Sequence, residues 1–215
     1  MSTIAQVPGR TYNGPTERTA LNNLPIDQSR GIQAMCGVIA TEFMLFVCMF
    51  GAYYYLGSNK DRWANEMPPH LSYALILLVI LLASSGILEW GSKRVDEGRP
   101  FAGRVALWVT VLLGIGFLVL QGFEYASEWK QTAPYSDSYG SIFYTITMLH
   151  AAHVIVGLLL LGFVGALPRY GLTRNTPHRP YKTVSLYWHF VDFVWVFIVL
   201  LLYVIPTFQS SMHGH

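Results

Sequence analysis

The chain has 215 residues, of which 53% are hydrophobic and 12% are charged, and its formal net charge is +2. This composition is typical of a single membrane domain, and it leaves no length for a separate soluble catalytic domain. We assign the small positive charge to membrane topology and expect no nucleic-acid partner.

Residues 1–31 are rich in Pro, Gly, Asn and Thr and contain no apolar core before a small-residue cleavage site. They therefore do not resemble a signal peptide, and we expect a cytoplasmic N-terminal tail. Residues 32–206 are predicted to form the membrane domain, and residues 207–215 a short external tail.

Five apolar stretches make up the membrane domain, and they cover residues 32–56, 71–90, 105–125, 141–167 and 184–205. Each is close to the ~20 residues that cross a bilayer as a helix. Lipid offers backbone N–H and C=O groups no water, so the spans must be helical. The predicted fold is all-α, a polytopic transmembrane bundle of five helices.

The 14 Lys and Arg residues set the expected orientation. One side of the five spans holds eleven of them and the other holds three, namely Lys60, Arg62 and Lys130. Cytoplasmic loops carry the excess of positive charge, so we expect the amino terminus in the cytoplasm and the carboxyl terminus outside.

The first span contains Glu42, about ten residues or roughly 15 Å from its cytoplasmic end, near the middle of the bilayer. A carboxylate there needs a partner. Glu42 is either protonated or faces a polar cavity or another subunit. Two roles for Glu42 stay open. It is either a neutral side chain that bonds to a neighbouring helix or a group that couples to proton movement, and both roles need the same local chemistry. Glu124 ends the third span, where aromatic side chains and water are expected.

The fourth span places Thr147, His150, His153 and Gly157 on one helical face. Gly157 allows a neighbouring helix to approach closely, and the polar side chains can form hydrogen bonds across that contact. A metal site would need further ligands at the same depth, and Glu42 alone qualifies. We therefore expect inter-helix hydrogen bonds and no metal site.

The fifth span places Ser185, His189 and Asp192 on one face. A carboxylate near an imidazole can fix the imidazole's tautomer. A polar cluster that joins this helix to another is the favoured interpretation. The sequence has no phosphate-binding glycine loop, nucleophile elbow or dinucleotide fingerprint, so these residues alone name no reaction.

Several segments together resemble subunit III of the haem-copper oxidases, most closely that of cytochrome c oxidase. They are TEFMLF at 41–46 with GAYY at 51–54, QGFEY at 121–125, YGSIFY at 139–144, HAAHV at 150–154, and YWHFVD at 187–192 with VW at 194–195. Their order and spacing match that family over about residues 32–206. The chain is similar to the short five-helix bacterial form. It departs from the family at Gly91, Ser92 and Lys93, where a His pair is common, and at Lys182, where Glu is common.

The resemblance implies a subunit of the bacterial inner membrane that binds no haem, copper or other metal. Subunits I and II would hold the metals, reduce oxygen and pump protons, while this chain packs on subunit I, holds phospholipid and supports proton uptake and stability during turnover. A larger respiratory supercomplex is a further implied partner. Glu42 matches the family's buried carboxylate. His150, His153, Glu124, His189 and Asp192 match positions that join helices.

Four residues are candidates for contact with lipid. Arg104, His178 and Arg179 are candidates for lipid headgroups, and ordinary positive-inside loop charge is the alternative. Trp188 could stack on an acyl chain or pack against neighbouring helices.

Three other functions stay open from the sequence. Two are related, namely subunit III of a quinol oxidase and the small relative associated with nitric oxide reductases. The third is a stand-alone proton-coupled carrier using Glu42 and the His pair, which predicts discontinuous helices or an inverted repeat around a midplane site. No such repeat is present in the sequence.

Overall fold

The computed structural model describes residues 28–58, 71–128, 138–166 and 178–207. These residues form five long helices and, within the described ranges, no strand. The helices are α2 (Gln28–Ser58), α3 (Leu71–Asp96), α4 (Pro100–Glu128), α5 (Ser138–Ala166) and α6 (His178–Ile198), which continues as the π-helical segment η2 (Val199–Val204).

Five spans within these helices are long and apolar enough to cross a membrane. They are Gly31–Gly57, Leu71–Asp96, Pro100–Ser127, Gly140–Ala166 and Pro180–Thr207. The predicted all-α bundle of five spans is therefore confirmed. Its orientation in the membrane stays a prediction. None of the described spans is interrupted by a loop, so the discontinuous helices that a carrier predicts find no support in these residues.

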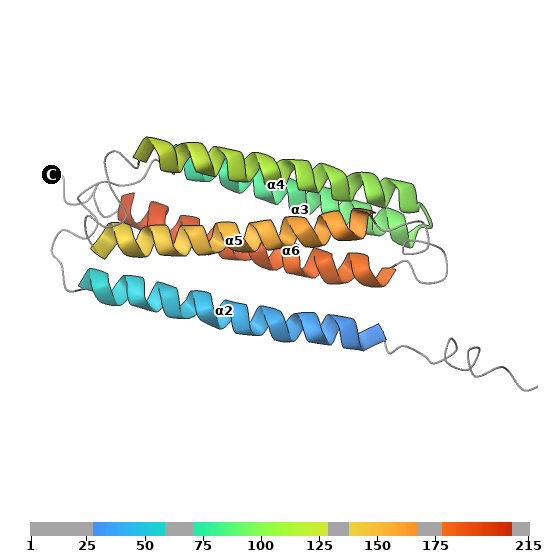
Figure 1. Ribbon diagram of the computed structural model, residues 1–215, viewed down its shortest axis with the longest axis horizontal. Helices are drawn as coiled ribbons and strands as arrows, with labels where there is room; N and C mark the ends of the chain where they lie inside the picture. Colours follow the sequence, from blue (N-terminus) through green and yellow to red (C-terminus); the bar gives the residue numbers. More distant parts are fainter. Residues whose placement is uncertain (1–27, 59–70, 129–137, 167–177, 208–215) are drawn as a thin grey trace, which may run out of the picture.

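The helices lie side by side in three layers (Figure 1). Helices α3 and α4 form one layer, α5 and α6 form the middle one, and α2 packs on the opposite side of α5 and α6. Only 6% of the apolar window of the first span is buried within the chain, compared with 56% in the last span. Helix α2 is therefore a peripheral helix, held along one face only.

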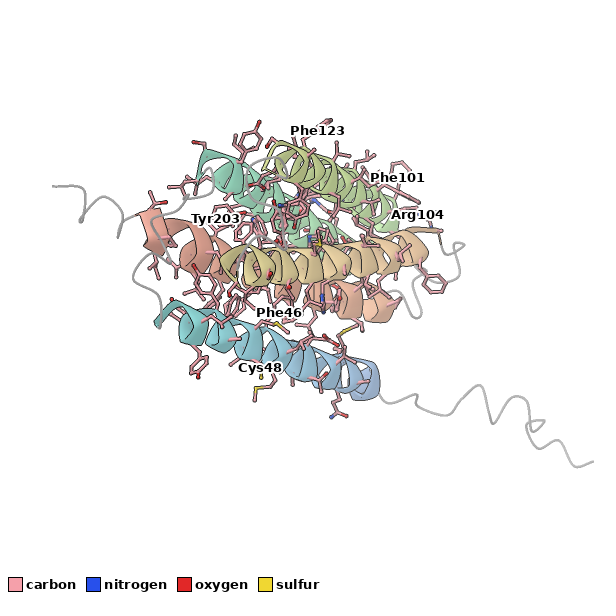
Figure 2. The ribbon with its side chains drawn as sticks, turned by 60° about the vertical axis from the view of Figure 1, so that its left-hand side comes forward. Phe46, Cys48, Phe101, Arg104, Phe123 and Tyr203 are labelled. Atoms are coloured by element: carbon pink, nitrogen blue, oxygen red, sulfur yellow. The ribbon has the colours of Figure 1, made fainter. Side chains whose placement is uncertain are left out.

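Figure 2 shows how α2 uses that face. Phe46 points toward α5 and α6 and is 1% exposed, whereas Cys48 lies on the outer surface of the helix. Phe101 and Phe123 are likewise exposed on α4. In a membrane such surfaces contact lipid or another subunit, because lipid is as apolar as these side chains.

A tight turn joins α3 to α4. Gly98 adopts a φ of 79°, the left-handed conformation that commonly ends a helix, and its N–H donates to the carbonyl of Val95. Pro100 then occupies the first position of α4, where its missing N–H has no helical partner to lose. Both helices extend past the apolar stretches predicted at 71–90 and 105–125, and the added turns contain polar residues.

Two glycines let α6 pack closely against its neighbours. A Cβ atom on Gly157 would lie 2.9 Å from the Trp188 ring, and one on Gly114 would lie 2.8 Å from it. The close approach predicted for Gly157 is thus confirmed. Trp188 and Trp195 are both completely buried and form the centre of the bundle.

Candidate functional site

Glu42 on α2 pairs with His153 on α5. Glu42 Oε2 lies 3.0 Å from His153 Nε2, and the other ring nitrogen of His153 lies 2.7 Å from the carbonyl oxygen of Leu149. This second contact requires His153 Nδ1 to carry a hydrogen, because a carbonyl oxygen can only accept. The side chain of Glu42 is 34% exposed and that of His153 is 12% exposed, so the pair is accessible from outside the bundle.

The pair forms part of the wall of a cavity between α2, α5 and α6. The cavity has a volume of about 260 Å³, and its other lining residues are apolar or aromatic: Met35, Val38, Ala152, Val156, Leu160 and Tyr187. The apolar lining of such a cavity can hold a hydrocarbon chain. The Glu42 carboxylate and the His153 imidazole can bind a polar or charged group in the same cavity. Sequence depth had indicated that Glu42 and His153 could meet, and they do.

His150 does not join this pair, although it lies one turn from His153. The side chain is 1% exposed, and its ring stacks on that of Trp195 with the two ring centroids 5.0 Å apart. Phe46 and Phe117 contact the His150 ring in edge-to-face geometry. Neither of its ring nitrogens has a hydrogen-bond partner among the described residues. Thr147 bonds to the carbonyl of Phe143 on its own helix, so the inter-helix hydrogen bonds expected of Thr147 and His150 are not formed among the described residues. His150 therefore packs helices together through its ring.

A second polar cluster joins α3 to α6. Ser85 Oγ lies 3.0 Å from His189 Nδ1 and is also hydrogen-bonded to Asp192 Oδ2, while Ser185 Oγ lies 3.3 Å from His189 Nε2. The expected joining of this helix to another is therefore present in the structure. Ser85 mediates it, and sequence reasoning missed Ser85; a serine pair inside the apolar second span was the available signal.

Trp188 lies next to this cluster. Its indole Nε1 donates to Ser84 Oγ at 2.9 Å, and the side chain is 0% exposed. Trp188 therefore has no surface to offer an acyl chain in this structure. Of the two interpretations drawn from the sequence, packing against helices is the one that its position supports.

Glu124 is more buried than its place at the end of a span suggests. It is 2% exposed, Gln121 Nε2 donates to it at 3.0 Å, and the Tyr203 hydroxyl donates to it at 3.4 Å. The expectation that water surrounds Glu124 is wrong, because side chains of α4 and the π-helical segment enclose the carboxylate. Glu124 thus joins α4 to the last span.

The predicted headgroup residues lie at the ends of α4 and α6. Arg104 is partly buried near the start of α4. His178 and Arg179 begin α6, but their side chains lie outside the described residues. At the same end of the bundle, Lys182 pairs with Asp96 at 3.4 Å and links α6 to α3.

Within the described ranges, no group of three or more His, Cys, Asp or Glu side chains could hold a metal ion. What these ranges contain is a five-span helical membrane protein with two carboxylate and imidazole sites between its helices. The fold and sites thus define a multi-pass membrane protein of the helix-bundle class.

Comparison with known proteins identifies the family. The family described as cytochrome c oxidase subunit III matches residues 26–207. A cytochrome c oxidase subunit 3 from Corynebacterium diphtheriae is 35% identical over 175 residues, which cover 78% of this chain and 84% of the relative. A probable cytochrome c oxidase subunit 3 from Mycobacterium tuberculosis is 32% identical over 174 residues, with the same coverage. The subunit from Loxodonta africana is 32% identical over 193 residues, 85% of this chain and 72% of the relative. The chain belongs to the cytochrome c oxidase subunit III family.

Proposed function

We propose that this chain is the metal-free subunit III of a proton-pumping cytochrome c oxidase in a bacterial cytoplasmic membrane. In this role it packs on subunit I of a complex that also contains subunit II, and those partners hold the haem and copper. Family membership over residues 26–207 supports the proposal. The reaction of the complex is then the reduction of oxygen, and this chain has no catalytic residue of its own.

The observation that carries the proposed role is the position of the Glu42 and His153 pair. It lies at a mostly apolar cavity of about 260 Å³ between the peripheral helix α2 and helices α5 and α6. A phospholipid acyl chain matches the apolar lining, so we assign lipid binding to this cavity. Lipid would then fill the space beside α2 and hold that helix against the bundle.

Glu42 is also the candidate residue for supporting proton uptake and turnover stability. A carboxylate about halfway along a membrane-spanning helix is costly unless it is paired, and such residues usually serve proton or ion movement. His153 supplies the pairing at 3.0 Å. The partial exposure of Glu42 leaves it accessible to a proton or to a group on a neighbouring subunit.

A spectrum of the native complex tests the proposal. The complex is purified in mild detergent through a tag on this chain, its subunits are identified, and a reduced-minus-oxidised spectrum is recorded. Haem bands together with a large haem-copper subunit are the expected result. A colourless protein without partners would overturn the proposal and favour the proton-coupled carrier.

The electron donor is tested on the same sample. Oxygen consumption with reduced cytochrome c is expected, because the relatives named above are cytochrome c oxidase subunits. Oxygen consumption with quinol alone would assign the chain to a quinol oxidase. Reduction of nitric oxide in place of oxygen would assign it to the nitric oxide reductase relatives.

A further inference from the structure

The cluster between α3 and α6 forms an unbroken row of four side chains. Ser185 contacts His189 Nε2, His189 Nδ1 contacts Ser85, and Ser85 contacts Asp192 Oδ2. Ser185 and Asp192 lie seven residues apart on α6, which corresponds to about 10 Å along the helix. The row therefore runs from near the start of α6 toward the middle of the last span.

With a neutral His189, and with Asp192 bonding to Ser85 through Oδ2, this row has two possible arrangements of its hydrogens. The Ser85 hydroxyl has one hydrogen, so it can donate either to Asp192 or to His189, but not to both. If Asp192 is a carboxylate, Ser85 donates to it, and His189 must donate to Ser85 from Nδ1 and accept from Ser185 at Nε2. If Asp192 carries a proton, it donates to Ser85, Ser85 donates to His189 Nδ1, and His189 donates to Ser185 from Nε2.

The two arrangements differ by one proton and by the direction of every hydrogen bond. In the change from the neutral to the ionised form, the Asp192 proton moves to Ser85, the Ser85 proton moves to His189 Nδ1, and the proton on His189 Nε2 leaves at the Ser185 end. One proton is released, Asp192 becomes negative, and His189 is neutral before and after. No oxidant, reductant or co-reactant is needed.

We propose that Ser185, His189, Ser85 and Asp192 form a proton-binding site in which a proton held on Asp192 exchanges through His189 toward the start of α6. The ligand is a proton, and no part of this site overlaps the Glu42 and His153 pair. The proposal does not depend on which electron donor the complex uses.

The surroundings of Asp192 support a bound proton. Asp192 is 4% exposed, and its Oδ1 atom has no hydrogen-bond partner among the described residues. A buried carboxylate oxygen with neither donor nor cation is costly, whereas the carbonyl oxygen of a neutral acid is much less so. His189 and Ser85 are only partly buried, so the row is not sealed from outside the bundle.

Other titratable groups on α6 and the helices packed against it have their own contacts. They include Glu42 with His153, Tyr187 with the carbonyl of His153, His150 against Trp195, Tyr181 with the carbonyl of Leu88, Lys182 with Asp96, Glu89 with Lys93, Arg94 with Glu97, and Tyr203 with Glu124. None of these contacts includes a member of the row. Ser85 is thus the residue that links the protonation of Asp192 to the tautomer of His189.

The tautomer of His189 is the direct test, and it is measured on the unaltered chain. The full chain is labelled with ¹⁵N-histidine, placed in lipid vesicles and followed by solid-state NMR across a pH titration, with His189→Gln used to assign the signal. We expect the hydrogen to move from Nε2 to Nδ1 as pH rises. A single neutral tautomer at every pH, or an imidazolium that persists beside an ionised Asp192, would overturn the proposal.

Infrared spectroscopy with three variants tests the coupling. The difference spectrum between acid and alkaline samples should contain a carboxylic acid C=O band that is lost in Asp192→Asn and shifted in Ser85→Ala. Ser84→Ala is the matched control, because it removes a neighbouring hydroxyl that contacts Trp188 and not Asp192. In Ser84→Ala the band should be unchanged. A band that survives in Asp192→Asn, or one that Ser85→Ala does not move, would count against the site.

Discussion

Two carboxylate and imidazole sites occupy the same bundle but are built differently. Glu42 contacts His153 directly, at the cavity beside the peripheral helix α2. Asp192 reaches His189 only through Ser85, between α3 and the central helix α6. The first pair is partly open to its surroundings, and Asp192 is buried.

The difference shows that packing gives similar carboxylate and imidazole side chains different roles in function and stability. On α2, few contacts surround the carboxylate, so a substitution there should change function more than stability. Between α3 and α6, Asp192 is 4% exposed, so loss of its polar partner should lower the stability of the whole bundle.

The largest effect is expected from a glycine in the core. Gly114→Leu should lower the free energy of unfolding by about 3 kcal/mol, because a Cβ atom there would already lie 2.5 Å from Leu158 and 2.8 Å from Trp188. Gly51→Leu on α2 is the matched control, since a Cβ atom on Gly51 has nothing within 4 Å. Thermal melting of both variants in lipid vesicles measures the contrast. Equal losses would show that α2 is as tightly packed as the core.

Asp192→Ala should lower the free energy of unfolding by about 2 kcal/mol, because Ser85 loses its hydrogen-bond partner and a buried gap remains. Glu89→Ala is a control in which an exposed carboxylate 3.9 Å from Lys93 is removed. It should change stability little. A melting temperature for Asp192→Ala equal to that of the control would contradict the account of the α3 and α6 cluster.

Removal of a tyrosine hydroxyl can be compared near the two sites, at Tyr181 between α3 and α6 and at Tyr187 beside the Glu42 and His153 pair. Tyr181 donates to the carbonyl of Leu88 on α3 at 3.0 Å, whereas Tyr187 reaches the carbonyl of His153 at 3.5 Å. Tyr181→Phe should cost about 1 kcal/mol, and Tyr187→Phe should cost less because its hydrogen bond is longer. Chemical denaturation of the two variants gives the comparison, and a reversed order would weaken the distinction between the sites.

The five spans could be predicted because membrane helices are set by local composition and length. The sequence could also predict that Glu42 and His153 lie at a similar depth in the membrane, because the helical rise per residue converts sequence position into depth. Gly157 indicated a close helix contact for the same local reason. Each of these features depends on residues within one helix or on the fixed rise per residue of a helix.

The remaining site features depend on how distant helices face one another. Ser85 lies 104 residues from His189, and no periodicity within either helix pairs them. The burial of Glu124 depends on Tyr203, which lies 79 residues away within the π-helical segment. His150 has the same spacing pattern as His153 but faces Trp195, so adjacent positions on one face acquired different partners.

Glu42→Gln in the intact oxidase tests most directly the claim that the pair beside α2 serves turnover. The variant complex and a Glu89→Gln control are compared for subunit content, proton uptake and oxygen consumption over repeated turnovers. The account predicts that Glu42→Gln retains this chain and starts at a rate near that of the control. Proton uptake should then be slower, or activity should be lost sooner. Loss of the chain from the complex, or proton uptake and lifetime equal to the control, would contradict it.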